Sequence, residues 1–118
     1  ETSKSVEVKT HAVETIGMIG SDKDYDILLK CISDKSWRVR FRAARYLGKS
    51  GKKRYEPYLR EMLNDNDSDV RYYAVLGLIQ NESSESKSLV KYISENDPAD
   101  YVREVAREHL QRAENDKL

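Results

Sequence analysis

The sequence has little of what disulfide-linked, loop-rich and membrane-spanning proteins require. Five glycines and two prolines among 118 residues favour an all-α fold over one rich in strands or loops. The single cysteine, Cys31, excludes an internal disulfide bond and fits a reducing compartment, so we expect a cytoplasmic location. No apolar run approaches the ~18 residues of a membrane span, and no signal peptide opens the chain. We therefore expect no membrane partner.

Motifs for catalysis and for metal binding are also missing. The two histidines, His11 and His109, lie far apart, and no group of His, Cys and carboxylate residues has the spacing of a metal site. A glycine-rich phosphate loop, a nucleophile elbow and an H-E-x-x-H motif are all absent. We interpret Cys31 as a packing thiol of the core. The sequence gives no indication of an enzyme, a cofactor or a metal.

What the sequence does contain is a repeat. Valines at positions 8, 39, 70 and 102 are separated by steps of 31, 31 and 32 residues. Five residues before each of the last three valines lies an Asp, an Arg follows each, and an Ala and a Leu come at one-turn spacing. A fixed period of this length with helical apolar spacing predicts a helical solenoid. The three full copies are Asp34, Val39, Arg40, Ala43, Leu47; Asp65, Val70, Arg71, Ala74, Leu78; and Asp97, Val102, Arg103, Ala106, Leu110.

We expect one domain over residues 1–118, a right-handed α-solenoid of about seven helices in antiparallel pairs. Glycines, prolines and capping residues place the breaks between helices, with Pro57 loosening a first turn and Asp97-Pro98 starting the last helix. The expected units are a half repeat at 1–20, complete repeats at 21–50, 51–81 and 82–113, and a tail at 114–118. The expected helices are 4–19, 22–33, 36–48, 53–64, 69–80, 84–94 and 97–113.

The first expected helix has no partner before it in the chain. Its apolar stripe of Val8, Ala12 and Ile16 would pack against a preceding helix in a complete solenoid, because natural solenoids end in polar caps. We therefore expect the chain to be a piece of a longer array, or to self-associate through this helix.

With these residues in view, the chain resembles the HEAT-repeat family, in particular the short repeats of the phycocyanobilin-lyase-like type. The resemblance rests on the Asp in the turn, the Val-Arg pair five and six residues later, and the Ala and Leu that follow. Pro57, eight residues before Asp65, also matches a proline of such repeats. The resemblance implies an α-solenoid whose second helices line a concave wall, and a binding scaffold more than any one activity. A bilin-lyase-like or chaperone role is a further alternative that it implies.

The repeated Asp and Arg residues have a structural interpretation. An Asp at a helix N-terminus accepts hydrogen bonds from backbone N–H groups and favours the helix dipole. An Arg one turn into the next helix can reach the Asp of a neighbouring repeat through forked hydrogen bonds. We expect a structural ladder that weakens at the first repeat, which has Ser3 and Lys9. Its residues are Asp34, Arg40, Asp65, Arg71, Asp97 and Arg103.

The second helix of each repeat supplies the candidate binding surface. Two and six residues after the repeat valine, side chains are expected to point away from the core. In the central repeats these positions and their neighbours combine arginines with aromatic rings, which is the composition of a binding hot spot. The alternative is that the rings only seal the joint between repeats. We expect a non-catalytic scaffold that binds a protein or an acidic peptide through Arg38, Phe41, Arg42, Arg45, Tyr72, Tyr73 and Leu76.

The charge distribution supports a second hypothesis. The formal net charge is zero, but residues 35–60 hold ten Lys and Arg against the single acid Glu56, a net charge of +9. Residues 1–34 have a net charge of −3 and residues 61–118 a net charge of −6. Nucleic-acid binding through residues 35–60 is therefore the alternative function, and it would weaken steeply with rising salt.

Overall fold

The computed structural model describes residues 25–81 and 84–116. This part of the chain contains α-helices and short 3-10 helices (η) and no strand, which confirms the all-α expectation. The helix expected at 4–19, with the stripe of Val8, Ala12 and Ile16, lies outside the described residues. The elements are α2 (Tyr25–Cys31), α3 (Trp37–Ser50), η2 (Lys53–Tyr55), α4 (Glu56–Met62), α5 (Ser68–Gln80), η3 (Ser84–Ser86), α6 (Lys87–Asn96) and α7 (Asp100–Asn115).

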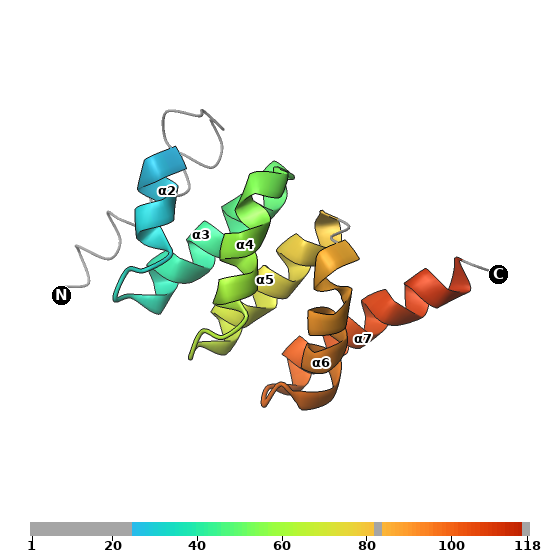
Figure 1. Ribbon diagram of the computed structural model, residues 1–118. Helices are drawn as coiled ribbons and strands as arrows, with labels where there is room; N and C mark the ends of the chain where they lie inside the picture. Colours follow the sequence, from blue (N-terminus) through green and yellow to red (C-terminus); the bar gives the residue numbers. More distant parts are fainter. Residues whose placement is uncertain (1–24, 82–83, 117–118) are drawn as a thin grey trace.

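The described helices form three antiparallel pairs stacked side by side (Figure 1). We call α2, α4 and α6 the first helices and α3, α5 and α7 the second helices. Each first helix packs on the second helix of its own pair, and α5 packs on both α3 and α7. The result is two layers, one of first helices and one of second helices, which share one continuous hydrophobic core.

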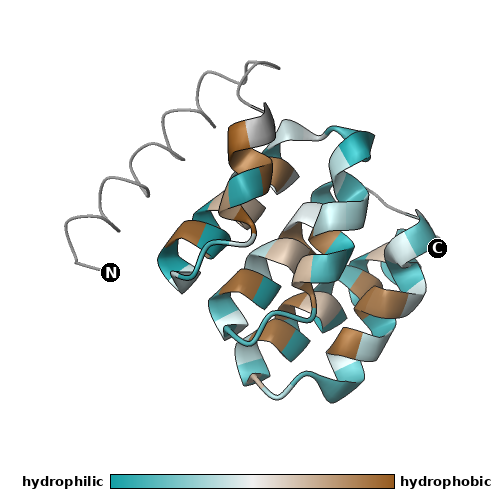
Figure 2. Ribbon diagram, turned by 60° about the vertical axis from the view of Figure 1, so that its left-hand side comes forward, coloured by the Kyte–Doolittle hydropathy of each residue, from teal (hydrophilic) through white to brown (hydrophobic). Residues whose placement is uncertain are grey.

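The repeat skeleton forms the buried contacts. Figure 2 shows hydrophobic and hydrophilic residues mixed along the helices. Helices α3, α6 and α7 each bury one face, whereas α5, between α3 and α7, is covered nearly all round and exposes only Gln80. Val39, Val70 and Val102 have no exposed surface, and the skeleton alanines are equally buried. Leu47 and Leu78 are buried as well, whereas the third skeleton leucine, Leu110, is half-buried. The last joint of the stack is therefore less closed than the first.

Local sequence explains how α4 and α5 begin. Asp67 is the N-cap of α5, and its carboxylate accepts hydrogen bonds from the backbone N–H groups of Asp69 and Val70 at 2.9 and 3.1 Å. Pro57 lies in the first turn of α4, where it is tolerated because no N–H is needed. The turn before it is the 3-10 helix η2, so the helix expected at 53–64 does begin loosely.

The expected start of the last helix was wrong. Helix α7 begins at Asp100 with Ala99 as its N-cap, not at the Asp97-Pro98 pair. The physical reason is that the Asp97 carboxylate accepts from the N–H of Ala99 and from Arg71. These bonds hold Asp97 and Pro98 in a turn before the helix. The N-caps Ser36, Asp67 and Ala99 each lie two residues after a repeat Asp.

Two glycines allow α3 and α5 to approach closely. A Cβ atom added to Gly48 would lie 2.6 Å from the Cα of Gly77, and one added to Gly77 would lie 2.9 Å from the Cα of Gly48. These contacts are with backbone atoms and cannot be relieved by a side-chain rotation. The N-terminal ends of the same two helices are joined by Arg40 and Asp65, so α3 and α5 run in the same direction along their whole contact.

Candidate functional site

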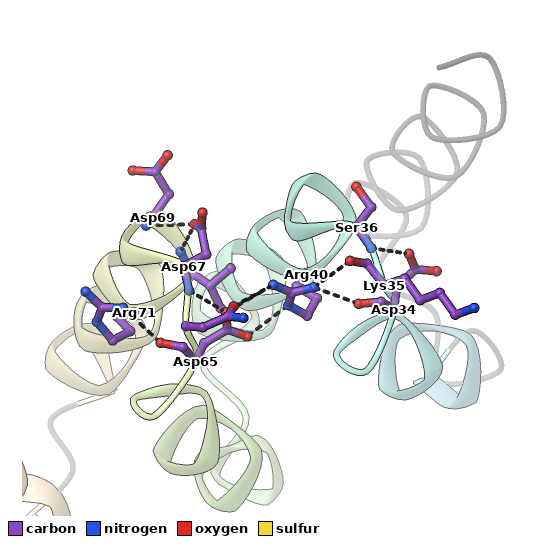
Figure 3. A network of polar contacts seen from close by, with 10 residues as sticks. Asp34, Lys35, Ser36, Arg40, Asp65, Asp67, Asp69 and Arg71 are labelled. Carbon is purple, nitrogen blue, oxygen red and sulfur yellow. Dashed lines mark hydrogen bonds and ion pairs between the residues drawn. The ribbon is translucent and has the colours of Figure 1, made fainter. Parts of the chain in front are cut away.

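The ladder arginine of the first described repeat joins two successive turns (Figure 3). Arg40 donates from Nε to Asp65 Oδ2 at 2.9 Å and from Nη2 to Asp65 Oδ1 at 3.2 Å. Its Nη1 donates to the backbone carbonyls of Asp34 and Lys35 at 2.9 and 3.0 Å. One guanidinium therefore holds the turn before its own helix and the turn of the following repeat, with the forked geometry that suits a carboxylate.

The second repeat has the same arrangement in a more buried setting. Arg71 donates from Nε to Asp97 Oδ2 at 2.9 Å and from Nη2 to Asp97 Oδ1 at 3.3 Å. Its Nη1 donates to the carbonyl of Asp65 at 2.9 Å. The Asp97 side chain is only 1% exposed. All three guanidinium nitrogens of each arginine are engaged inside the protein, so their donors stabilise the stack.

The aspartates of the ladder shape their own turns. Each carboxylate accepts a hydrogen bond from the backbone N–H two residues later at 2.9 Å, on Ser36, Asp67 and Ala99. Arg103, in the last described repeat, donates to the carbonyl of Asp97 and to the carboxylate of Asp100 in its own helix. Its contacts in the described residues therefore stay within one repeat.

A continuous row of rings crosses the three second helices. We call Trp37, Phe41, Tyr73, Tyr72 and Tyr101 the aromatic row. Neighbouring ring centroids are 5.5, 5.6, 5.3 and 5.5 Å apart in that order. The row starts on α3, passes over α5 and ends on α7. These spacings are within the range of favourable stacked and edge-to-face ring pairs.

Arginines of α3 flank the row. The guanidinium carbon of Arg38 lies 5.6 Å from the centre of the Trp37 ring, and that of Arg42 lies 4.9 Å from the centre of Phe41. Arg45 reaches the Tyr73 ring of the next repeat at 5.9 Å. At these distances a cation is attracted to the ring face. The structure thus brings Arg38, Phe41, Arg42, Arg45, Tyr72 and Tyr73 onto one surface.

The burial of the rings differs from what the helical wheel suggested. The wheel predicts that Phe41 and Tyr72 point away from the core, but both rings, and the neighbouring Tyr73, are half-buried and pack against it. Leu76 is also half-buried. The reason is that neighbouring second helices lie close together, so a side chain on the outer face of one helix packs against the next helix. The middle of the row therefore seals joints between repeats as well as facing outward.

The sequence reasoning missed both ends of the row. Trp37 and Tyr101 are 39% and 41% exposed, and they lie two and one residues before their repeat valines. The hydroxyl of Tyr101 bonds with Asp69 Oδ1 at 2.5 Å and with Ser68 Oγ at 2.7 Å. The pKa of Tyr101 is raised above its ordinary value, mainly by partial burial and secondly by this contact with the Asp69 carboxylate. A search of every aromatic within two residues of a repeat valine would have found both rings.

The surface that carries the aromatic row is also graded in charge. We call it the second-helix wall. On α3 it carries Arg38 and Arg45, and on α7 it carries the exposed residues Glu104 and Glu108, of which Glu108 lies at the repeat position of Arg45. Between them, α5 contributes mainly the two tyrosines and Leu76. The wall is therefore basic on α3, aromatic at its centre and acidic on α7.

The rest of the described chain offers little that is typical of catalysis. Residues 25–81 and 84–116 hold no group of three or more His, Cys, Asp and Glu arranged to bind a metal.

An open groove of about 680 Å³ lies between the end of α5, the start of α6 and the last turns of α7, with Ile79, Val90 and Leu110 in its lining. None of the described helices is long and apolar enough to cross a membrane.

Comparison with known families agrees with the repeat pattern. The family model of HEAT repeats matches residues 26–111, which is most of the chain. None of the curated proteins matches the chain.

Proposed function

The chain belongs to the HEAT-repeat family, and on that premise we propose that it is a non-catalytic scaffold whose second-helix wall binds a protein or peptide. Proteins of this family commonly serve as scaffolds for protein interaction and are generally non-catalytic. A repeat fold does not specify a ligand, so the proposal depends on the wall itself.

The observation that carries the proposal is the aromatic row with its flanking arginines. The row spans all three described pairs, so a ligand lying across the wall contacts every second helix. Rings provide large apolar area at a low cost in conformational entropy, and arginines provide fixed, forked donors for carboxylates. Aromatic and arginine residues are enriched among the residues that dominate binding energies.

The composition of the wall over α3 and α5 indicates the ligand. Arg38 and Arg45 flank rings there, while Arg40 is occupied by Asp65 in the ladder. An acidic segment with some apolar side chains satisfies both kinds of group. We therefore propose an acidic peptide segment of a protein as the ligand of this half of the wall.

The single tryptophan supplies the measurement. Because Trp37 is the only tryptophan and lies at one end of the row, its fluorescence reports occupancy of the wall. Short peptides rich in Asp, Glu and Leu are titrated into the protein, with the same peptides carrying Lys in place of the acids as the matched control. We expect the acidic peptides to change the emission of Trp37 and the basic ones to leave it unchanged.

Variants then separate binding from packing. Tyr72→Ala is expected to weaken peptide binding by about 2 kcal/mol, the usual effect at a hot spot, while Tyr72→Phe retains most of the affinity. Tyr92 on α6 is the matched control, because it is 62% exposed on a first helix and Tyr92→Ala removes the same side chain away from the wall. Arg38→Glu tests charge at an exposed position outside the core. Unchanged binding in Tyr72→Ala and Arg38→Glu together would contradict the proposal.

Nucleic-acid binding through residues 35–60 has weaker support. Arg40 is paired with Asp65, and Arg60 Nη1 lies 3.7 Å from Glu85. Both acids lie outside residues 35–60, so they neutralise part of the net charge of +9. A titration with duplex and single-stranded DNA at low salt decides the question, since phosphate-driven binding is strongest there. A cytoplasmic location is also part of the proposal, because a chain with a single cysteine, Cys31, fits a reducing compartment.

A further inference from the structure

We infer that the protein partner of the second-helix wall is a second copy of this chain, with two walls packed face to face around a twofold axis parallel to α5. The inference rests on the proposed function, because it names the partner of the same surface. A twofold interface uses one patch on both subunits, so that patch must be complementary to itself. The gradient of charge across the wall meets this condition.

The charges select the direction of the axis. The second helices run side by side (Figure 1), and rotation about an axis along α5 places α3 of one copy over α7 of the other. Arg45 then faces Glu108 of the second copy, because both lie six residues after their repeat valines. The twofold axis produces this pair twice. An axis perpendicular to the helices would instead place the α3 arginines of one copy over those of the other, which is repulsive.

The rings fit the same arrangement. The two exposed members of the row, Trp37 and Tyr101, lie at opposite ends. The rotation brings each over the other in the second copy, so both exposed rings become covered. At the axis, Tyr72 and Leu76 of α5 meet the same residues of the second copy. The centre of the interface is therefore apolar and aromatic, with charged pairs toward its two sides, as in stable protein interfaces.

A stable dimer needs to cover only a small part of the surface of the chain. An interface of standard size covers roughly 800 Å² on each partner, about a tenth of the 7501 Å² surface of this chain. Two kinds of like-charged contact result. At the axis Asp69 approaches Asp69 of the second copy, where each carboxylate also accepts from the hydroxyl of Tyr101 in its own chain. Toward the helix ends Lys49 faces Arg112 of the second copy, both ten residues after their valines. The side chains of Lys49 and Arg112 are exposed, long and near the helix ends. There they can separate into solvent, so the Lys49–Arg112 pair has little effect on the interface.

Self-association is measured by sedimentation equilibrium at low salt. For the wild-type chain we expect the average mass to rise from 13.7 kDa toward twice that value with concentration in the micromolar range. Arg45→Glu opposes two acids at each charged pair, and Glu108→Arg opposes two bases. Each single variant is expected to dissociate at least about tenfold more readily than the wild type.

The decisive sample is an equimolar mixture of Arg45→Glu and Glu108→Arg. In the mixed dimer each Glu at 45 would face an Arg at 108 and each Arg at 45 a Glu at 108, so opposite charges meet at both pairs. We expect the mixture to associate about as tightly as the wild type, although neither component does so alone. Glu61→Arg and Lys91→Glu, on the exposed faces of α4 and α6, change the net charge equally and should leave association unchanged.

Three results would overturn the inference. These are a wild-type chain that stays monomeric throughout that range, single variants that still associate like the wild type, and a mixture no tighter than its components. The second result would place any dimer contact elsewhere, for example on the helix expected at 4–19. If the inference fails while acidic peptides still bind in a Tyr72-dependent way, the proposed scaffold function stands with a different partner.

Discussion

The two joints between second helices start from the same repeat skeleton and differ in closeness. Between α3 and α5, contact runs from the ladder at one end to Gly48 and Gly77 at the other. Between α5 and α7, contacts join only the N-terminal halves of the two helices. They are the ladder pair of Arg71 with Asp97 and the ring contact of Tyr72 with Tyr101. The C-terminal half faces the open groove. The repeat skeleton thus fixes the N-terminal end of each joint. Residues outside the skeleton decide how closely the helices pack at the C-terminal end.

The glycines explain the difference. The position of Gly48 in α3 is taken by Ile79 in α5, and the position of Gly77 in α5 is taken by His109 in α7. Helices approach backbone to backbone only where side chains are absent. Ile79 and His109 both line the groove, so the second joint is held apart where the first is closed.

The ion pairs of the ladder also differ between the two joints, but here the second joint has the more buried pair. The side chains of Arg40 and Asp65 are 14% and 12% exposed, whereas those of Arg71 and Asp97 are 10% and 1% exposed. Arg40 also donates to the side chain of Asn66 at 3.2 Å. The first joint therefore depends more on close helix packing, and the second more on its buried ion pair.

The contrast should be strongest when the ladder carboxylates that bridge the two joints, Asp65 and Asp97, are removed one at a time. Asp97→Ala leaves the Arg71 guanidinium buried without its carboxylate, which typically costs about 3 kcal/mol or more. Asp65→Ala is expected to cost less, about 1 kcal/mol, because Arg40 keeps its carbonyl and Asn66 partners and is nearer to solvent. Urea unfolding followed by circular dichroism measures both losses. Equal losses would show that burial of the second pair does not matter.

The glycine contact should give the next largest effect. In Gly48→Ala the new methyl group meets the Cα of Gly77 at 2.6 Å, so the helices must separate, and overpacking of this kind costs about 1–3 kcal/mol. The loss is expected even though alanine favours helix formation by about 1 kcal/mol. Gln111→Ala is the matched control at the exposed equivalent position of α7 and should change stability by less than about 0.5 kcal/mol. A Gly48→Ala variant that melts at or above the wild-type temperature would refute the packing account.

The smallest effect concerns Tyr101 at the second joint. Its pKa is raised above 10.0, first by burial and then by Asp69, so the protonated hydroxyl contributes stability that is complete below pH 10. That contribution is lost as the pH rises through the folded-state pKa. Tyr101→Phe should therefore be slightly less stable than the wild type below pH 10 and approach it at higher pH. Thermal melts across this range test it, with Tyr92→Phe as control, and a gap independent of pH would contradict the assignment.

Much of the fold was predictable because the repeat is a local pattern. The 31- and 32-residue steps located the helix pairs, and the spacing of the valines, alanines and leucines identified the buried face. The structure confirms the all-α fold, and the match to the HEAT-repeat model confirms the helical repeats. The beginning of α7 was not predictable from Asp97-Pro98, because the Asp97 carboxylate is occupied by Arg71 from another repeat.

The candidate site was predictable only in part. The sequence indicated Arg38, Phe41 and Tyr72 as neighbours across repeats, because the period places equivalent positions side by side. It did not indicate that Trp37 and Tyr101 extend the row, since their positions relative to the repeat valines differ from those of the other rings. Whether such rings meet depends on the offset between neighbouring helices.

The sequence by itself thus determined the repeat, the pairing of helices and the residues that each helix buries, because these follow from spacing along one chain. Only the tertiary structure decided how near the helices come. Gly48 meets Gly77 at the first joint, while Ile79 and His109 hold the second apart. That separation results from packing between residues about 30 positions apart, which the spacing of residues along one helix does not reveal.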